Sequence, residues 1–488
     1  MRRIATGLAA ILCVTVAGGC ARSSLRIDGG DEGAGASAGT GGTGGTAGTG
    51  GTAGTGGTAG TGGTGVNPTT CVLGVPVDAV EVIDEPGRDG NTSSLVVTDV
   101  GDPAVGLPSA VVLQAVVSDH SAPNDIMALP IRFDPVAYPG GMGIFQNPSA
   151  VVTNTWSYAQ MALSDSPQPA IAFSWNAASQ GVQFRTTDEW ASQPGPVVHV
   201  WATNATPRGM AAGAGAASMG GGYSGEGFGL GWNDQYPDTL MVAAVLSDDG
   251  MVTAGPHPIL GPDPIPDCSS PAITWSGETY LIATSVHDCG SPGPLCAAPR
   301  VVVSRFRPAS GDAWDDSGID FVSAIAPHNG IARLSTPTIA SWQGRSAVAW
   351  MEAADTDDAP RTVRIVGLSA DGQPIGAPQV VATDAHPTSP IRLSASRLGW
   401  VVLWAEDGDS TLPEDEPGWS SVMGHQLDDD LQPMGPPFTM DATRFSSWGL
   451  APAVGIDYPP ALVMTWAARS RSSANTAAFV SRIECDSP

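Results

Sequence analysis

Apolar residues from residue 71 onward occur in short runs separated by turn-forming residues. Glycine, proline, asparagine and aspartate stand between the runs, as they do between strands. No long stretch shows the 3.6-residue spacing of apolar positions that marks an amphipathic helix. In GEGFGLGW, residues 225–232, glycine occupies alternate positions, which predicts a strand with one bare face that a neighbour can approach closely. The pattern predicts an almost entirely β region over residues 71–488.

Four segments of this region share one layout. Each has an apolar strand ending in tryptophan, then a polar loop of variable length, then a second strand. A further strand often precedes the tryptophan strand and begins at or near a proline, as in PAITWSG from Pro271 and PTIASWQG from Pro337. Asp371-Gly372 follows one of the second strands, and Asp-Gly favours a hairpin because glycine tolerates positive φ. The segments begin at Gly227, Ser346, Gly399 and Ala461, and their tryptophans are Trp232, Trp350, Trp404 and Trp466.

The repeat length indicates one architecture. A unit of roughly 50 to 65 residues with about four strands is typical of one blade of a β-propeller. Because a single blade cannot bury both of its faces, the repeats must pack on one another, and the tryptophans are expected in the core between blades. We expect a β-propeller of about seven blades, with six blades or tandem β-sandwiches as alternatives. Unit starts are expected near Pro108, Pro169, Ala216, Pro271, Pro337, Pro390 and Pro452.

The cysteines bear on how such a ring closes. Two of the seven, Cys13 and Cys20, lie near the N-terminus, and the other five are Cys71, Cys268, Cys289, Cys296 and Cys485. A propeller must join its two ends, so residues 71–83 can complete the last blade, and a Cys71–Cys485 disulfide would lock that closure. The second candidate disulfide is Cys289–Cys296, with the pairing of Cys268 with either of them as the alternative. A zinc site from Cys268, His287, Cys289 and Cys296 is disfavoured because its spacing matches no zinc pattern.

The N-terminus has the features of a bacterial export signal. Arg2 and Arg3 precede an apolar stretch, residues 4–16, which is shorter than the roughly 20 residues of a membrane-spanning helix. Three small residues then lead to Cys20. This resembles the lipobox of bacterial lipoproteins, although Ala17 stands where that family usually has leucine. The resemblance implies a signal peptide over residues 1–19 and a lipid on Cys20. Because no acidic residue follows the cysteine, it also implies an outer-membrane anchor, facing the periplasm or the cell surface.

A low-complexity segment separates Cys20 from the β region. Residues 42–65 contain only glycine, threonine and alanine, so they bury too little apolar surface to fold. Residues 20–70 are therefore expected to form a disordered tether, in which the roughly 40 low-complexity residues from Gly29 to Gly65 have a reach of about 35 Å. The sequence G-A-S-A-G at residues 35–39 matches the G-x-S-x-G nucleophile motif, but it lacks the strand-to-helix context that this motif needs.

The order of these parts resembles a known family. An export signal, a Gly/Thr-rich stalk and tryptophan-containing repeats with the turn LSADGQPIG, residues 368–376, are similar to bacterial surface lipoproteins with propeller-like repeats. The related turn LDDDLQPMG, residues 427–435, departs from this pattern because Leu431 replaces glycine. The family implies no defined activity.

The charge of the chain and its candidate ligand residues limit the partners and cofactors that we expect. The chain has 48 acidic residues against 21 arginines and no lysine, for a net charge of −27, which argues against a nucleic-acid partner. Acidic clusters at residues 355–358, 407–416 and 428–430 lie between predicted strands and lack the spacing of a calcium loop. No cofactor is therefore expected, with calcium as the minor alternative. The seven histidines have no metal-type spacing.

We therefore expect a membrane-anchored, exported lipoprotein. Its propeller head is predicted to be a non-catalytic module that binds a protein or a glycan. No catalytic or metal-binding residues are assigned. The alternative is an exported glycan-processing hydrolase, whose two carboxylates would lie in the central channel of the propeller.

Overall fold

The chain folds into β-strands, and the described residues contain no helix. In the computed structural model, the described residues are 80–83, 89–99, 109–118, 124–133, 142–144, 149–155, 159–163, 170–177, 181–201, 218–223, 227–234, 240–247, 249, 251–259, 267–268, 271–288, 299–306, 318–328, 331, 333–353, 361–385, 391–396, 399–407, 420–441, 453–457, 461–469 and 476–484. The predicted all-β class is confirmed.

The described strands form six hydrogen-bonded sheets, and the first two follow one another along the chain. The first sheet contains β2 (Asp89–Asp99), β3 (Ser109–Ser118), β4 (Asn124–Phe133), β5 (Met142–Ile144) and β6 (Ser149–Thr155). The second contains β7 (Ala159–Leu163), β8 (Ala170–Ala177), β9 (Gly181–Asp188) and β10 (Val198–Trp201). Within each sheet the paired strands run antiparallel, as in a meander.

The next two sheets repeat this arrangement. One contains β11 (Ser218–Tyr223), β12 (Phe228–Asp234), β13 (Leu240–Leu246) and β14 (Val252–Pro258). The other contains β15 (Asp267–Cys268), β16 (Ala272–Trp275), β17 (Tyr280–Asp288), β18 (Arg300–Phe306) and β19 (Ile319–Ile325).

The largest sheet has nine strands and consists of two such units. The first unit contains β20 (Arg333–Leu334), β21 (Thr338–Trp342), β22 (Arg345–Ala353), β23 (Arg361–Leu368) and β24 (Pro374–Ala385). The second contains β25 (Arg392–Ser396), β26 (Gly399–Asp407), β27 (Ser420–Leu427) and β28 (Phe438–Asp441). A single residue pair, Ala385 with Glu406, joins the two units.

The last sheet closes the ring with a strand from the other end of the chain. It contains β29 (Ala453–Asp457), β30 (Ala461–Arg469), β31 (Thr476–Glu484) and β1 (Val80–Ile83). Strand β1 pairs antiparallel with β31, and Val80 lies opposite Val480. The predicted closure by residues 71–83 is therefore confirmed for residues 80–83. Cys71 and Cys485 lie outside the described residues, so their disulfide stays a prediction.

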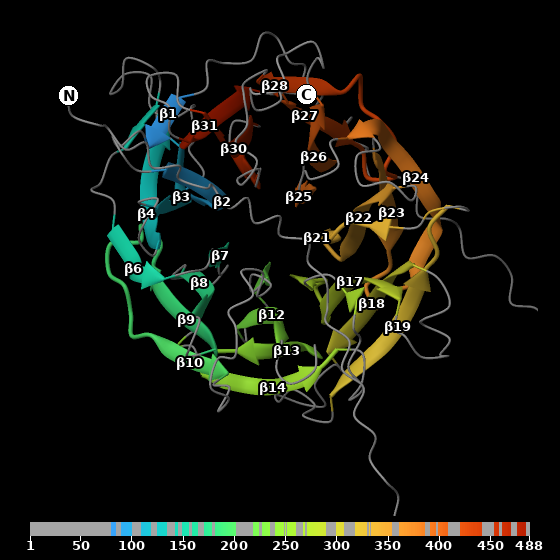
Figure 1. Ribbon diagram of the computed structural model, residues 1–488, viewed down its shortest axis with the longest axis horizontal. Coiled ribbons are helices and arrows are strands. Elements are labelled where there is room, and N and C mark those ends of the chain that lie inside the picture. Colours follow the sequence, from blue (N-terminus) through green and yellow to red (C-terminus); the bar gives the residue numbers. More distant parts are fainter. Residues whose placement is uncertain are drawn as a thin grey trace, which may run out of the picture.

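The sheets are arranged radially around a central axis (Figure 1). Strands β21 and β25 lie near the axis, whereas β14, β19 and β24 form part of the outer rim. Neighbouring inner strands adjoin one another, from β11 through β16 and β21 to β25, and β29 adjoins β2. This arrangement is a β-propeller and excludes tandem β-sandwiches. Because two units share one hydrogen-bonded sheet, the blade number of about seven stays a prediction.

Two of the expected unit starts are wrong by one strand. Pro108 and Pro169 directly precede β3 and β8, and each of these is the second strand of its sheet rather than the innermost. The inner strands β2 and β7 carry no tryptophan and are not introduced by a proline. The repeat therefore begins earlier in these two units than the proline pattern indicates.

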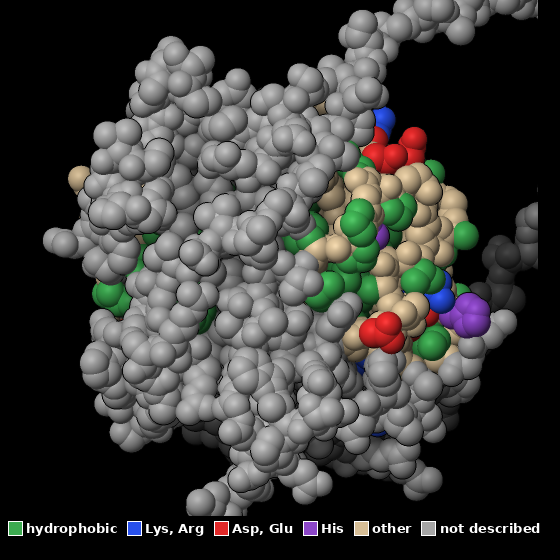
Figure 2. Space-filling view, turned by 90° about the horizontal axis from the view of Figure 1, so that it is seen from above, with side chains coloured by type: hydrophobic (Ala, Val, Ile, Leu, Met, Phe, Trp, Pro, Cys, Tyr) green, Lys and Arg blue, Asp and Glu red, His purple; other side chains and the backbone are tan. Residues whose placement is uncertain are grey.

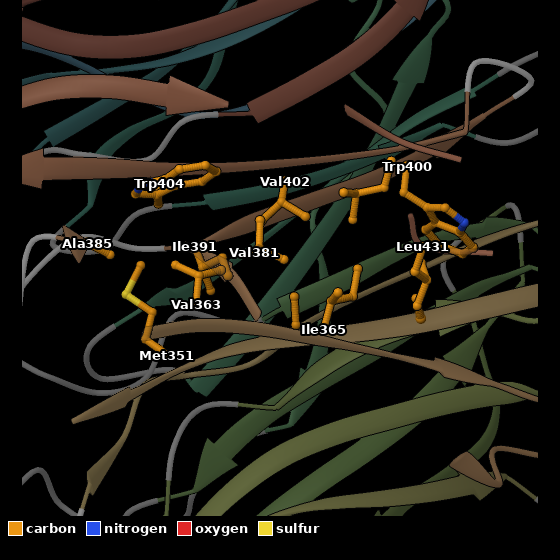
Figure 3. Packing of buried hydrophobic residues seen from close by; sticks show 13 residues of the cluster. Met351, Val363, Ile365, Val381, Ala385, Ile391, Trp400, Val402, Trp404 and Leu431 are labelled. Atoms are coloured by element: carbon orange, nitrogen blue, oxygen red, sulfur yellow. The ribbon is translucent and has the colours of Figure 1, made fainter. Parts of the chain in front are cut away.

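The tryptophans lie in the core between consecutive units, as expected. Trp232 packs with residues of β7–β9, and Trp350 packs with residues of β17 and β18. Trp404 lies in a cluster that joins β22 and β23 to β26 (Figure 3), and it is fully buried. Trp466 lies on β30, but its side chain is outside the described residues. The radial packing is thus held by large apolar side chains at equivalent positions.

The alternating glycines form a bare strand face, as predicted. A Cβ atom on Gly229 would lie 2.6 Å from Cδ1 of Tyr280, which belongs to the next sheet. The hydroxyl of Tyr280 donates a hydrogen bond to the backbone oxygen of Gly227. The glycines therefore let an aromatic ring pack directly against the backbone of β12.

Three turns between the third and fourth strands of their units share one hydrogen-bond pattern. The backbone N–H of the first residue donates to the oxygen of the fifth at 2.8 Å, in the turns 247–251, 369–373 and 428–432. In the second turn, Gly372 has a φ of 88°, and in the third, Leu431 adopts a φ of 63°. The Leu431 side chain is buried in the core beside Trp400 (Figure 3), which offsets the strain of a left-handed leucine.

The outer strands carry prolines along their free edges. Pro256 and Pro258 lie on β14, and Pro374 and Pro378 lie on β24. Strand β24 also exposes apolar side chains, with Ile375 63% exposed. Figure 2 shows hydrophobic side chains among polar ones on the described part of the surface. Because proline has no N–H group, these edges offer an incomplete ladder to an incoming strand.

Candidate functional site at the loop end of the propeller

The two ends of the propeller differ in their connections. In the unit β21–β24, the tight turns at residues 342–345 and 369–373 lie at one end. Residues 354–360 and 386–391 connect strands at the opposite end, which we call the loop end. Glu352, Arg361 and Arg392 lie at or next to strand termini on this end. The loop end therefore gathers the charged residues that follow.

Glu352 is the only acidic residue in the buried core of the described residues. Its Oε1 accepts hydrogen bonds from the indole Nε1 of Trp350 at 3.1 Å and from the backbone N–H of His328 at 3.2 Å. Its Oε2 forms an ion pair with Nε of Arg364 at 2.5 Å. The carboxylate is 1% exposed. Both oxygens are thus occupied by donors from the protein.

These contacts indicate a structural role for Glu352. Trp350 and Glu352 are two residues apart on β22, so their side chains point to the same face of the sheet. The ion pair joins β22 to β23, and the bond from His328 fixes the segment that follows β19. A closed, paired carboxylate of this kind holds the chain together and has no free oxygen for a ligand.

A sequence signal for this site is the spacing Trp-x-acid. It occurs at Trp350 and Glu352 and recurs at Trp232 with Asp234 and at Trp404 with Glu406. Trp175 is followed by Ala177 instead, and its buried indole Nε1 has no hydrogen-bond partner. At Trp350 the acid two residues later, Glu352, supplies the acceptor for the indole.

Arg392 lies at this end of an inner strand, β25 (Figure 1). It is the first residue of β25, an inner strand that is joined to β21 by the bond from the Leu393 N–H to Thr338 Oγ1 at 3.3 Å. Its Nη1 donates to the backbone oxygen of Ile391 at 3.2 Å. Burial lowers the pKa of Arg392 to about 10, and no acidic residue of the described chain pairs with it. Among the residues that the structure describes, its guanidinium has no anionic partner.

The residues predicted from sequence fall mostly elsewhere. Cys20, Cys71, Cys289, Cys296 and Cys485 lie outside the described residues, so the lipid and both disulfides stay predictions. Cys268 and His287 lie on β15 and β17, but their side chains are not described.

The described acidic residues form no metal site. Within the described ranges, no group of three or more His, Cys, Asp or Glu side chains is placed to hold a metal ion. Residues 355–358 and 408–416 lie outside these ranges, so the calcium alternative is untested there. Asp428 lies in a tight turn, where its Oδ1 accepts the backbone N–H of Asp430 and Gln432. None of the described segments forms a helix that could cross a membrane.

Comparisons with known proteins show distant likenesses. No family model and no curated protein matches the chain. A protein of unknown function from Dyadobacter fermentans has a TM-score of 0.47 and 9% identity, covering 84% of this chain and 99% of that one.

Two further similar structures are named as an α-L-arabinofuranosidase and an endo-arabinanase. The α-L-arabinofuranosidase Arb93A from Fusarium graminearum has a TM-score of 0.40 and 11% identity over 84% of this chain and 98% of that one. The GH43 endo-arabinanase from Bacillus licheniformis has a TM-score of 0.31 and 9% identity over 66% and 92%. With every score below 0.5, these likenesses transfer no activity and no residue role to this chain.

Proposed function

We propose that this chain is an exported lipoprotein whose β-propeller binds a glycan with a carboxylate group at the loop end. The observation that carries the proposal is Arg392, a partly buried cation of an inner strand with no acidic partner among the described residues. A guanidinium binds a carboxylate through two parallel hydrogen bonds. A ligand carboxylate at this position would offset the cost of partly burying the charge of Arg392.

The net charge limits the kind of glycan. At −27, the chain repels polyanions at long range. A glycan with an isolated acidic sugar fits better, because repulsion between distant charges is screened at physiological salt, whereas a contact with a partly buried arginine is screened much less. We therefore place a single uronic acid at Arg392, with neutral sugars extending away from it.

The Arg392→Gln variant tests this function. The probe is an oligosaccharide ending in glucuronic acid, compared with the same oligosaccharide ending in glucose, and the measurement is isothermal titration calorimetry. We expect the wild type to bind the acidic form, and Arg392→Gln to bind it roughly 10- to 100-fold more weakly, since a hydrogen bond to a charged group contributes about 1.5–3 kcal/mol.

The matched control is Arg345→Gln. Arg345 is an exposed arginine that pairs with Asp429 at 2.9 Å at the other end of the propeller, so its loss should leave binding unchanged. Equal binding of the acidic and neutral probes by the wild type, or an equal loss in both variants, would contradict the assignment to Arg392.

Glycan hydrolysis is the second candidate. The Trp-x-acid spacing places Asp234 and Glu406 at the ends of second strands, as it does Glu352, and a glycosidase needs two such carboxylates. The same probes are therefore assayed for released reducing ends. Turnover that is lost in Asp234→Asn or Glu406→Gln would replace the binding function with a hydrolytic one.

The lipid anchor makes a separate prediction. We propose that Cys20 becomes the lipid-modified N-terminus and that residues 21–70 hold the propeller away from the outer membrane. Mass spectrometry of the mature protein should find residue 20 as the first residue with an added acyl mass, and Cys20→Ala should leave the membrane fraction. An unmodified Cys20 on a cleaved chain would exclude the anchor without affecting the binding proposal.

A further inference from the structure

Three turns between the third and fourth strands of their units place one residue in a left-handed conformation. In the turns 188–192, 369–373 and 428–432, the backbone N–H of the fourth residue donates to the oxygen of the first at 2.9, 2.9 and 3.0 Å. The fourth residues are Ala191, Gly372 and Leu431, with φ values of 55°, 88° and 63°. Because this conformation is costly for alanine and leucine, contacts of these residues outside the turn are expected to offset the cost.

The side chains of Ala191 and Leu431 are buried against the preceding unit. Ala191 lies in a core cluster with Val151 of the first sheet. Leu431 lies in the core cluster shown in Figure 3, together with Val363 of β23. Its Cδ1 lies 3.7 Å from the position that a Cβ atom on Gly367, also of β23, would take. We call the fourth residue of each turn the knob, and the third-strand residue that it meets in the preceding unit the socket.

Gly372 is a knob without a side chain. A Cβ atom on it would lie 3.1 Å from Cδ2 of Leu281 and 3.1 Å from Cγ1 of Val303, which is closer than ordinary van der Waals contact. Both residues belong to the sheet β15–β19, and Val303 is the socket on its third strand, β18. Oγ of Ser323, on β19, donates to the backbone oxygen of Gly372 at 3.2 Å. The preceding sheet therefore leaves room only for glycine at this position.

The fifth residue of two of these turns adds a polar contact to the same preceding unit. Nε2 of Gln373 donates to the backbone oxygen of Val322 on β19 at 3.1 Å. Nε2 of Gln432 donates to Oε1 of Gln379 on β24 at 3.3 Å. In both cases the contacted strand is the outer strand of the preceding unit, so each turn covers both the third and the fourth strand of that unit.

Knob and socket have complementary sizes. Val303 and Gly367 are equivalent, because each lies on a third strand and faces the following unit. Val303 belongs to the core cluster that includes β22 and β23, and Gly367 is two residues from Ile365, which lies in the cluster with β26. The valine socket is matched with the glycine knob Gly372, whereas the glycine socket is matched with the leucine knob Leu431. The volume that one side lacks is thus supplied by the other.

We propose that these knob and socket pairs make the units β20–β24 and β25–β28 each fit its own predecessor rather than the predecessor of the other. A glycine knob would leave a void over the socket Gly367, and a leucine knob would overlap the socket Val303. Repeat proteins are prone to pair the wrong units or to exchange units between copies, and the size match disfavours such pairings. The knobs lie at the end opposite Arg392, so this inference is independent of the proposed glycan binding.

The first test exchanges sizes at the boundary between the units β20–β24 and β25–β28. The thermal midpoint of the mature full-length protein is measured by circular dichroism. Gly367→Val should lower the midpoint by about 2 °C or more, because its methyl groups overlap Leu431. Leu431→Ala should also lower it, because a void is left. The double variant should melt higher than either single variant, since the valine then occupies that void.

Gly367→Ala is the matched control for this boundary. Its Cβ atom would lie 3.7 Å from Cδ1 of Leu431, an ordinary van der Waals distance. The variant should therefore keep or raise the midpoint, which separates overpacking by valine from the mere loss of glycine. Losses that simply add in the double variant Gly367→Val with Leu431→Ala would overturn the proposal.

The second test compares two glycines that share a left-handed backbone. Gly372 and Gly376 have φ values of 88° and 79°, and a Cβ atom on Gly376 would meet no described atom within 4 Å. Alanine carries a similar backbone cost at both positions, so the difference between the two variants measures the contact with the socket. We expect Gly372→Ala to melt lower than Gly376→Ala, and its loss to be smaller in a Val303→Ala background. Equal losses at the two glycines would exclude Val303 as a socket.

Selection of the neighbouring unit is measured separately from stability. After refolding from urea, size-exclusion chromatography gives the fraction of monomer. Gly367→Val should give more associated protein than Gly367→Ala, and the double variant with Leu431→Ala should return to the wild-type fraction. Equal monomer fractions in all of these variants would show that the knobs stabilise the ring without selecting a neighbour, and the proposal would be refuted.

Discussion

Deleting residues 71–83 from the mature chain is expected to lower the thermal midpoint by about 10 °C or more, which corresponds to several kcal/mol of unfolding free energy in a domain of this size. Strand β1 is the only strand of the last sheet that comes from the N-terminal end of the chain. Without it, the edge of β31 is exposed and the ring is no longer held shut. The measurement is thermal unfolding by circular dichroism, with size-exclusion chromatography to detect association.

Two variants separate the causes of this loss. Deletion of residues 21–70 should leave the midpoint unchanged, because this segment is the predicted tether. Cys71→Ser removes the predicted disulfide and keeps the strand; if Cys71 and Cys485 are bonded, it should cost about 6 kcal/mol in the chain-entropy model. An unchanged midpoint after deletion of residues 71–83 would show that β1 does not stabilise the ring.

Glu352→Ala is expected to lower the free energy of unfolding by ~3–5 kcal/mol, since breaking a buried ion pair leaves a buried charge. The change removes the partner of Arg364 and the acceptor of the Trp350 indole and the His328 amide. Urea unfolding measures the loss, and Glu352→Gln is the milder variant if the alanine protein does not fold.

The control is the exposed ion pair of Arg345 with Asp429, whose side chains are 56% and 65% exposed. Asp429→Asn should change stability by about 0–1 kcal/mol. The double variant Glu352→Ala with Arg364→Met should recover much of the loss, because no unpaired charge remains. A double variant as unstable as the two single losses added together would instead show that the two residues act independently.

The main features of the fold follow from local sequence. An apolar run that ends in tryptophan predicts a second strand and its inter-unit contact, because a large side chain at a repeated strand position must be buried between repeats. The alternating glycines before Trp232 likewise predict the close approach of a neighbour, which is Tyr280. The tryptophan and the alternating glycines can both be interpreted from one strand alone, because side chains in a strand point to alternate faces.

The start of the repeat is harder to predict where no proline precedes the inner strand. Strand β7 has the sequence AQMAL, and Pro169 introduces the strand after it. Proline marks the end of a connection, and both inner and second strands can follow one. The residue at which a repeat begins can therefore be predicted from the sequence only where a proline precedes the inner strand, as at Pro271 and Pro337.

The contacts of the charged residues at the loop end form between separate strands, so the sequence of one strand does not predict them. Glu352 meets the amide of His328, and Arg333 approaches Arg361, only after the register of β20, β22 and β23 is set. No spacing within one segment encodes those pairings. The bond from Trp350 to Glu352 is the exception, because the indole and its acceptor lie on one face of the same strand.

The prolines of the outer strands affect how neighbouring copies of the protein contact one another. Under the proposed anchoring, the heads share a plane and meet rim to rim, so their local concentration far exceeds that in solution. An exposed apolar edge such as that of β24 would then act as a template for the next copy. Pro374 and Pro378 interrupt that template, so a densely coated membrane can carry these propellers as separate particles rather than as a joined lattice.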